Sequence, residues 1–408
     1  MVTILKGGRA RFFPQRHGGV LAPGFMKIRE VPFGSMGGVY EQDDVEVVSR
    51  MLTDVADEEG TFFPLPEESD FQNAFAAHEG ARKAIAVNSC GTGLDCSMMA
   101  LDVGAGDEVI TTPLTFVCTA GTAIARGARV VLADIDPASL NLDPKKVRER
   151  ITPRTRAIIP VHFAGLACDL DAFDLISEET GVPVIYDAAH AVGTRFQGEP
   201  VGGRGKASCY SFQSNKNMTC LGEGGAVTTD DEEFAEQVRQ LKTFGYVYGG
   251  SGTRVVRVGF NYRMTKPQYA VGLTQLAKID RVTQDRRDRM LRLNALLADV
   301  EEVILPFGHG PDHGSHLHVI RLDTDAVGFA TDAFVAHLKD RYHVGTAKHY
   351  PPLWTWEALQ ELGYNGDGCP VAARVCDQVV STPVFPGTTD EDLEYIAWAI
   401  KQTISELR

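Results

Sequence analysis

Short apolar runs alternate with segments of helical spacing along much of this 408-residue chain. The runs are four to six residues long and rich in Val, Ile and Ala, and turns containing Gly, Pro or Asp separate them from the helical segments. Alternation of this kind is typical of βαβ units, whose parallel strands form a sheet covered by helices on both faces. It predicts an α/β fold with a mostly parallel sheet. The expected strands are 84–88, 109–112, 130–135, 157–161, 182–187 and 209–212, with 226–229 as a candidate antiparallel strand.

The C-terminal third has a different pattern. Apolar residues recur at helical spacing in 269–299, which is expected to form a long helix that bridges a large domain to a smaller one. We expect an N-terminal extension over residues 1–34, a large domain over 35–275, and the bridging helix with a small C-terminal domain over 276–408. The other expected elements are helices at 40–54, 71–80, 94–101, 330–340 and 390–407 and a strand at 317–322.

Charge and cysteine usage exclude several kinds of protein. The 40 basic and 54 acidic side chains give a net charge of −14, so a nucleic-acid partner is not expected. No apolar run reaches the length of a membrane span, and the first 23 residues lack the apolar segment of a signal peptide. The eight cysteines are scattered and form no CxxC pair, which argues against a metal site and a disulfide scaffold. These features predict a reduced, cytoplasmic protein.

Two polar residues follow predicted strands, where a ligand is expected. Asp187 ends the run 182–187, and Lys216 follows the run 209–212 and precedes the turn 222–225. Ligands of open α/β sheets bind at the carboxyl ends of strands. An amine that can hold an aldehyde and a carboxylate that can keep a pyridine nitrogen protonated are the two halves of a pyridoxal phosphate (PLP) site. Either residue alone is more often a surface charge or a helix cap, so it is the pair that favours the cofactor.

The turn Ser-Cys-Gly-Thr-Gly at 89–93 is a candidate phosphate site. The amides at the start of a helix attract anions, Gly91 allows close approach, and Thr92 adds a hydroxyl. Ser211, at the end of another predicted strand, could add a second hydroxyl. The alternative is an ordinary strand-to-helix turn in which Ser or Thr is the N-cap.

Several further candidates are open to more than one interpretation. Phe116 could stack on a planar ring, and His190 could face the phenolic oxygen of PLP, but a single aromatic or histidine is more often part of the core. Asn261 and Arg263 precede the long helix, and His349-Tyr350 lies in the small domain. Spacing alone does not separate a substrate contact from an ordinary turn at these positions.

Together these segments resemble the DegT/DnrJ/EryC1/StrS aminotransferases, fold-type I PLP enzymes that aminate keto-sugars and keto-cyclitols. The chain differs from many members at Tyr186, where Glu is frequent, and its spacing from Lys216 to Glu223 is one residue longer. The matching segments are in the family's order and are 89–92, 106–120, 134–144, 160–165, 186–193, 211–229, 260–264 and 349–354.

The resemblance implies the fold of a type I PLP-dependent transferase, with a mostly parallel seven-stranded sheet flanked by helices and a smaller C-terminal α+β domain. It implies that Lys216 holds the aldehyde, Asp187 the ring nitrogen and His190 the ring oxygen. A site that also takes a residue from the neighbouring subunit implies a homodimer. The other implied roles are stacking for Phe116, phosphate binding for Gly91, Thr92 and Ser211, phosphate binding in the neighbouring subunit for Asn261, and substrate contacts for Arg263, His349 and Tyr350.

The implied activity is transamination, in EC class 2.6.1. An amino acid, glutamate or glutamine, would donate the amino group, and a nucleotide-linked keto-sugar would receive it in an amino-sugar pathway such as antibiotic or surface-glycan biosynthesis. A keto-cyclitol is the alternative acceptor. A deoxysugar dehydratase is disfavoured because such relatives carry His in place of Lys216. A non-catalytic PLP-fold protein is disfavoured because Asp187, Lys216 and the phosphate turn occur together.

Overall fold

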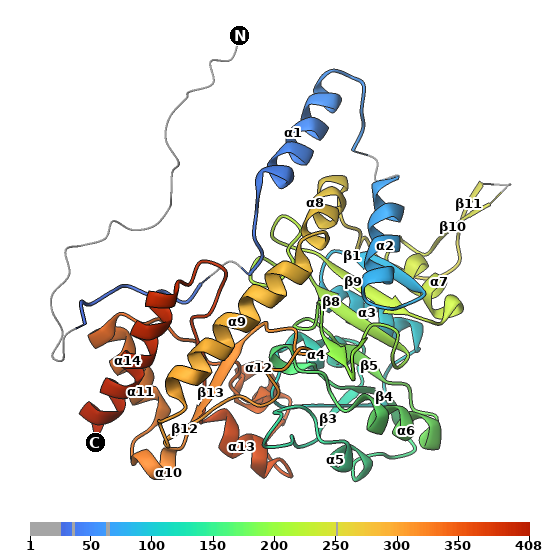
Figure 1. Cartoon of the computed structure of the whole chain (residues 1–408). Coiled ribbons are helices and arrows are strands. Elements are labelled where there is room, and N and C mark those ends of the chain that lie inside the picture. Colours follow the sequence, from blue (N-terminus) through green and yellow to red (C-terminus); the bar gives the residue numbers. More distant parts are fainter. Residues whose placement is uncertain (1–25, 35–36, 63–65, 250–251) are drawn as a thin grey trace.

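The protein is described by a computed structural model that covers residues 26–34, 37–62, 66–249 and 252–408 (Figure 1). Most of the expected N-terminal extension, residues 1–25, lies outside these ranges. No helix in the described part of the chain is long and apolar enough to cross a bilayer. All eight cysteines are free.

Two hydrogen-bonded groups of strands lie side by side at the centre of the fold. One has the order β1-β9-β8-β5 and the other β3-β2-β4. The neighbouring pairs β2–β3, β2–β4 and β5–β8 are parallel, whereas β9 is antiparallel to both β1 and β8. The strands are β1 (Lys83–Val87), β2 (Glu108–Thr111), β3 (Arg129–Leu132), β4 (Thr155–Ile159), β5 (Ile185–Asp187), β8 (Ala207–Ser211) and β9 (Gly225–Thr229).

The junction between the two groups lies between β4 and β5. Isolated parallel bridges join Ile158 to Val184 and Val161 to Asp187. Pro160 and Pro183 lie in this junction and accept hydrogen bonds from the amides of Asp187 and Ile158, respectively. Because proline has no amide hydrogen to donate, a regular ladder is interrupted here. The two groups together have seven strands, and isolated bridges rather than a regular ladder join β4 to β5.

Both faces of the central strands are buried. Successive residues point to opposite faces, so Val109 belongs to one apolar core and Ile110 to another, and Ile159 and Ile158 are divided in the same way. A strand that is buried on both faces has no polar alternation, which explains the continuous apolar runs in the sequence. The helices that cover the faces are α2 (Glu67–His78), α3 (Cys90–Ala100), α4 (Cys118–Ala125), α5 (Pro144–Arg148), α6 (Leu170–Thr180) and α7 (Glu232–Leu241).

The expected long helix over 269–299 is two helices, α8 (Lys266–Leu276) and α9 (Ile279–Leu297). The break is at Lys278, whose backbone (φ −114, ψ 2) is not helical. Figure 1 shows α9 running from α8 at the large sheet to the C-terminal elements. Of the two helices, α9 is the one that extends from the large sheet to the C-terminal elements.

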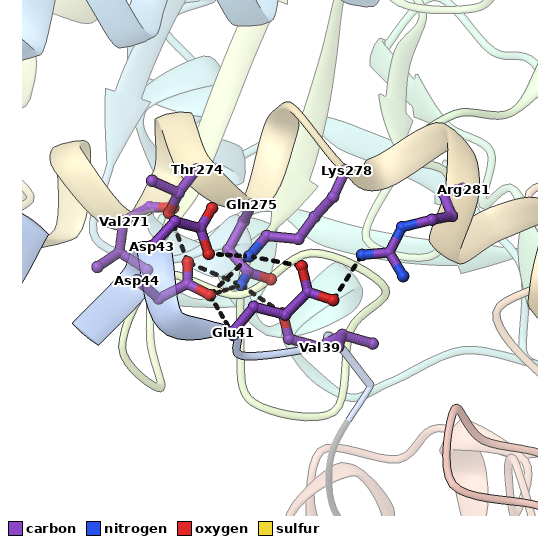
Figure 2. A network of polar contacts seen from close by, with 9 residues as sticks. All are labelled: Val39, Glu41, Asp43, Asp44, Val271, Thr274, Gln275, Lys278 and Arg281. Atoms are coloured by element: carbon purple, nitrogen blue, oxygen red, sulfur yellow. Dashed lines mark hydrogen bonds and ion pairs between the residues drawn. The ribbon is translucent and has the colours of Figure 1, made fainter. Parts of the chain in front are cut away.

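A polar network at this break holds the start of α1 (Gln42–Ala56), and Figure 2 shows it from close by. The Lys278 ammonium lies 2.7 Å from the Asp44 carboxylate and 2.9 Å from that of Asp43. Asp44 also accepts hydrogen bonds from Gln275 and from the Thr274 hydroxyl. Asp44 and Lys278 are both buried, so the network fixes the N-terminal segment against α8 and α9.

The C-terminal part is built on an antiparallel sheet with the order β12-β13-β14. Its apolar core is formed with α9, α11 and α14. Its elements are β12 (Val303–Ile304), β13 (His318–Leu322), α10 (Thr324–Val327), α11 (Thr331–Tyr342), α12 (Glu357–Glu361), α13 (Pro370–Cys376), β14 (Val379–Thr382) and α14 (Asp390–Leu407).

A hairpin that the sequence analysis did not predict projects from the large sheet (Figure 1). It consists of β10 (Tyr246–Gly249) and β11 (Gly252–Val255), and all four residues of β11 are exposed. Val258, just after the hairpin, is 84% exposed. A smaller hairpin is formed by β6 (Arg195–Phe196) and β7 (Glu199–Pro200).

Candidate active site

Asp187 ends one of two neighbouring parallel strands, and Lys216 lies in the turn that follows the other. Asp187 is the last residue of β5 and lies opposite Cys209 of β8, so both strands end at the same edge of the sheet. Lys216 follows β8 in a turn in which its amide donates to the Gln213 carbonyl at 2.9 Å. Asp187 and the turn that carries Lys216 therefore lie at the same edge of the sheet, and the charge of Asp187 acts on the Lys216 ammonium.

The Asp187 carboxylate is buried and accepts from two donors, and the Cys90 thiol lies nearby with its single hydrogen closer to the Cys209 carbonyl, at 3.1 Å. The Thr119 hydroxyl donates to Oδ2 at 2.7 Å, and the Ala189 amide donates to Oδ1 at 3.1 Å. The Cys90 thiol lies 3.6 Å from Oδ1. Burial raises the pKa of this thiol, and the charge of Asp187 raises it further, so Cys90 is a protonated donor. These contacts fix the direction in which the carboxylate points.

The Lys216 side chain is partly buried, and burial lowers the pKa of its ammonium. The negative charge of Asp187 acts in the opposite direction but does not cancel the effect. A lysine with a lowered pKa has a larger fraction of neutral amine, which is the form that attacks a carbonyl or removes a proton.

His190 is buried and has a defined tautomer. Its Nδ1 accepts a hydrogen bond from the Ala164 amide at 3.2 Å, so the proton of the neutral ring must be on Nε2. Nε2 lies 3.2 Å from the Tyr350 hydroxyl and therefore donates to it. Burial, and then the charge of Lys216, lower the pKa of His190 well below its usual value. His190 thus presents a neutral N–H donor.

Aromatic side chains flank this donor. The rings of Phe116 and Tyr350 are 6.1 Å apart, and Phe116 is 52% exposed. Burial raises the pKa of the Tyr350 hydroxyl, so it stays protonated. His349 Nδ1 lies 2.8 Å from the Ser381 hydroxyl, and burial lowers the pKa of His349 to about 4. The structure therefore brings Phe116, His190 and Tyr350 together and places His349 beside them.

The turn at 89–93 is the start of α3. Ser89 is the N-cap: its hydroxyl accepts from the Thr92 amide, and the Thr92 hydroxyl accepts from the Ser89 amide. This capping box starts the helix at Cys90, earlier than the expected 94–101, because capping chemistry overrides the weak helix propensity of Gly91. The turn is thus both a cap and a helix N-terminus, so the two interpretations of the sequence coexist.

Gly91 leaves space that the protein itself does not fill. A Cβ at this position would meet no atom closer than 3.7 Å, so packing within the chain does not require glycine. Ser211, at the end of β8, is buried, and its hydroxyl accepts from the Gln213 amide at 3.4 Å. An uncrowded helix N-terminus, a carboxylate held at a strand end and an amine with a lowered pKa form a donor set that fits PLP.

Asn261 and Arg263 are placed differently from the other candidates. Both are exposed, and Arg263 Nε donates to Asn261 Oδ1 at 3.0 Å. The Arg263 guanidinium lies 5.4 Å from the centre of the Phe244 ring. No hydrogen bond or ion pair among the described residues connects either side chain to Asp187 or Lys216.

The segment that carries Asn261 and Arg263 is anchored through Tyr262. The Tyr262 carbonyl accepts from the Asn88 amide, and its hydroxyl donates to Asp95, which also binds the Arg126 guanidinium. The two flanking side chains are therefore held at the surface beside the end of β1.

Sequence reasoning missed four residues that surround this site: Cys90, Thr119, Asn217 and His316. Thr119 is three residues after Phe116, and Cys90 is inside the proposed phosphate turn, so both were within motifs already singled out. His316 belongs to a histidine-rich segment at 309–318, which was a usable signal. No cluster of three or more His, Cys, Asp and Glu side chains within the described ranges could hold a metal ion.

Comparison with known proteins gives a family match, a curated relative and two similar solved structures. The profile of the DegT/DnrJ/EryC1/StrS aminotransferase family matches residues 43–401. The chain is 37% identical over 374 residues to the spore coat polysaccharide biosynthesis protein SpsC of Bacillus subtilis, covering 89% of this chain and 95% of SpsC. It superimposes on DesV of S. venezuelae with a TM-score of 0.80 and 30% identity, covering 88% and 95% of the two chains. The PLP form of the putative sugar aminotransferase Spr1654 from Streptococcus pneumoniae, 23% identical, has the same fold (TM-score 0.84, covering 93% and 100%).

Proposed function

Because the chain belongs to the DegT/DnrJ/EryC1/StrS aminotransferase family, we propose that it is a PLP-dependent aminotransferase acting on a keto-sugar. The proposed donor is an amino acid, glutamate or glutamine, and the proposed acceptor is nucleotide-linked. The name of SpsC, a polysaccharide biosynthesis protein, supports a sugar acceptor. The observation that carries the proposal is that Asp187, at the end of β5, and the turn with Lys216 that follows the paired strand β8 lie at the same edge of the sheet.

PLP, when bound, would supply an aldehyde and an electron-accepting ring. The Lys216 amine would hold the aldehyde and, once released, would take the α-proton of the donor and pass a proton to the carbon that had carried the aldehyde. Its lowered pKa favours the neutral amine that this proton transfer needs. Asp187, fixed by Thr119, would keep the ring nitrogen protonated.

The remaining residues would bind and orient. His190 would turn its Nε2 hydrogen from the Tyr350 hydroxyl, which accepts it in this structure, to the ring oxygen, and Phe116 would cover one face of the ring. The amides of Gly91 and Thr92 and the Ser211 hydroxyl would hold the phosphate. Asn261 would bind the phosphate in the neighbouring subunit. Arg263, His349 and Tyr350 would contact the substrate.

We also propose a homodimer with shared sites. The support for a homodimer is that Asn261 and Arg263 are exposed and have no hydrogen bond or ion pair to Asp187 or Lys216 among the described residues of their own chain. The exposed hairpin β10–β11 lies just before them in the chain. The proposed domains are those expected from the sequence, 35–275 and 276–408 after an extension over 1–34, and the free thiols support a cytoplasmic location.

The test is a Lys216→Ala variant assayed for transfer of the amino group from glutamate and glutamine. We expect a folded protein without turnover. The matched control is Lys206→Ala, just before β8, which removes an ion pair with Asp231 and a cation–π contact with Phe234 and should keep full turnover. Near-wild-type turnover of Lys216→Ala would refute the assignment.

A further inference from the structure

A second buried histidine lies against His190. The ring of His316 is 4.3 Å from that of His190, at an angle of 40°. His316 is in the segment before β13, far from His190 in the sequence. Asn217, the residue after Lys216, is buried on the other side of His316. His316 is therefore placed between the lysine turn and the proposed ring-oxygen donor.

Hydrogen bonding fixes which nitrogen of His316 carries the proton. The Gly314 carbonyl can only accept, so the Asn217 side-chain nitrogen must donate to it, at 2.6 Å. This orientation leaves the Asn217 oxygen facing His316 Nδ1, at 3.3 Å. An amide oxygen can only accept, so Nδ1 of His316 carries the hydrogen. His316 and His190 therefore have opposite tautomers, with the proton on Nδ1 in one ring and on Nε2 in the other.

The backbone that carries His316 is held from two sides. The Gly314 and His316 amides donate to the carbonyls of Gly165 and Ala164, at 2.8 and 3.0 Å. Ala164 is also the residue whose amide binds His190. The two rings are thus positioned by the same short turn, η1 (Phe163–Gly165).

On the other side, α9 contributes a buried arginine. The Arg286 side chain donates to the carbonyls of Ser315, His316 and Gly37. The same guanidinium therefore binds the His316 loop and the N-terminal segment that packs on the lysine turn. The backbone of His316 cannot move away from η1 and α9 unless these bonds break.

We propose that Asn217 and His316 are positioning residues for the reaction: Asn217 sets the tautomer and orientation of His316, which holds the His190 ring so that its Nε2 hydrogen stays directed into the site. The same contacts tie the backbone next to Lys216 to the Gly314 loop. The inference rests on the proposed function, because it assigns what these two residues do for His190 and Lys216.

If Asn217 and His316 had a purely structural role, they would also be buried and hydrogen-bonded. The test must therefore measure which nitrogen of each histidine ring carries the proton. The structure offers a matched control in the Asn294 side chain, whose oxygen lies 2.8 Å from Nε2 of the buried His318. Asn294 also contacts His309, and none of these residues contacts Lys216 or His190 among the hydrogen bonds of the described chain. Asn294→Ala therefore removes the same type of bond from a buried histidine away from the site.

The first measurement is nitrogen NMR of the cofactor-free protein with ¹⁵N-labelled histidine. In the wild type we expect the proton on Nδ1 of His316 and on Nε2 of His190. In Asn217→Ala the His316 signals should become those of mixed tautomers and the His190 signals should shift. Asn294→Ala should change His318 and His309 only. Unchanged His316 and His190 signals in Asn217→Ala would overturn the inference, whether or not the protein is an aminotransferase.

The second measurement is the rate of the donor half-reaction in the PLP-loaded protein. We expect Asn217→Ala to lower kcat about tenfold, which corresponds to about 1.4 kcal/mol of transition-state stabilisation, with KM for the donor nearly unchanged. A KM effect alone, or an equal loss in Asn294→Ala, would overturn the positioning role. If Asn217→Ala does not fold, His316→Phe, which keeps a ring against His190 without its Nδ1 hydrogen, replaces it with the same expected kcat loss and His190 shift. Inactivity of the wild type with every donor would instead count against the proposed function.

Discussion

Gly37 is the residue at which the N-terminal segment touches the lysine turn, and its replacement is expected to disturb both stability and chemistry. The Gly37 amide donates to the Ser214 carbonyl at 2.9 Å. A Cβ on Gly37 would lie 2.1 Å from the Asn215 carbonyl oxygen and 2.2 Å from that of Lys216. Cβ atoms in proteins do not approach other atoms closer than 3.0 Å, so the Gly37→Ala chain must move by at least 0.9 Å (3.0 − 2.1).

The atoms in the way are backbone, so a side-chain rotation cannot relieve the contact. Overpacking of this kind costs about 1–3 kcal/mol of unfolding free energy. The displaced segment includes Lys216, and a misplacement of about 1 Å at a reacting group can cost about 10²-fold in rate. Gly37→Ala should therefore lower both the free energy of unfolding and the single-turnover rate with the amino donor.

The assay is urea denaturation together with stopped-flow single turnover of the PLP-loaded protein. Gly104→Ala is the control, because a Cβ there meets no atom within 4 Å and the φ is not positive. It should be neutral or stabilising by about 0.4–1 kcal/mol through the unfolded state. If Gly37→Ala has wild-type stability and single-turnover rate, the account of this contact is wrong.

Three further predictions concern the network of Figure 2, the shared site and acid stability. Asp44→Ala should lower the free energy of unfolding by about 3 kcal/mol because it leaves Lys278 buried with fewer partners. Lys278→Met should then lower the free energy of unfolding less in the Asp44→Ala background than in the wild type. Strictly additive effects of the two substitutions would contradict this. In a homodimer with shared sites, an equal mixture of Lys216→Ala and Asn261→Ala chains, unfolded and refolded together, should recover about a quarter of wild-type activity, whereas sites confined to one chain predict none. Burial lowers the pKa of His309 to about 4 from 6.5, so the unfolded state binds the extra proton between these values. The contribution of neutral His309 to the free energy of unfolding is full above pH 6.5 and is lost as pH falls towards 4, by up to about 1.4 kcal/mol per pH unit. In His309→Gln, the free energy of unfolding, measured by denaturation at a series of pH values, should fall less steeply over this range.

The strands of the large sheet could be predicted well because burial on both faces leaves continuous apolar runs in the sequence. The start of α3 was placed too late, since Gly91 and Gly93 hide a helix that the Ser89–Thr92 capping box begins. The long helix 269–299 was predicted as one element because its periodicity continues through Lys278. At the break, Lys278 pairs with acidic residues of α1 that are distant in sequence.

For the candidate site, the sequence placed Asp187, Lys216, His190 and Phe116 in one neighbourhood because each follows a strand end or a turn. It did not place His316, because that residue reaches His190 only through the fold of the C-terminal part against the sheet. The roles of Asn261 and Arg263 remain proposals, since they involve a second chain.

Lys216 is proposed to hold PLP beside Asp187 and to take part in a transamination cycle. The most direct measurement is the visible absorption spectrum of the purified protein with PLP, before and after addition of L-glutamate or L-glutamine. We expect an absorption band from the cofactor linked to Lys216. This band should disappear when the true donor is added, because the cofactor is converted to its amine form, and it should be absent in Lys216→Ala. A protein that gives no such band with PLP, or a Lys216→Ala variant that retains it, would contradict the account.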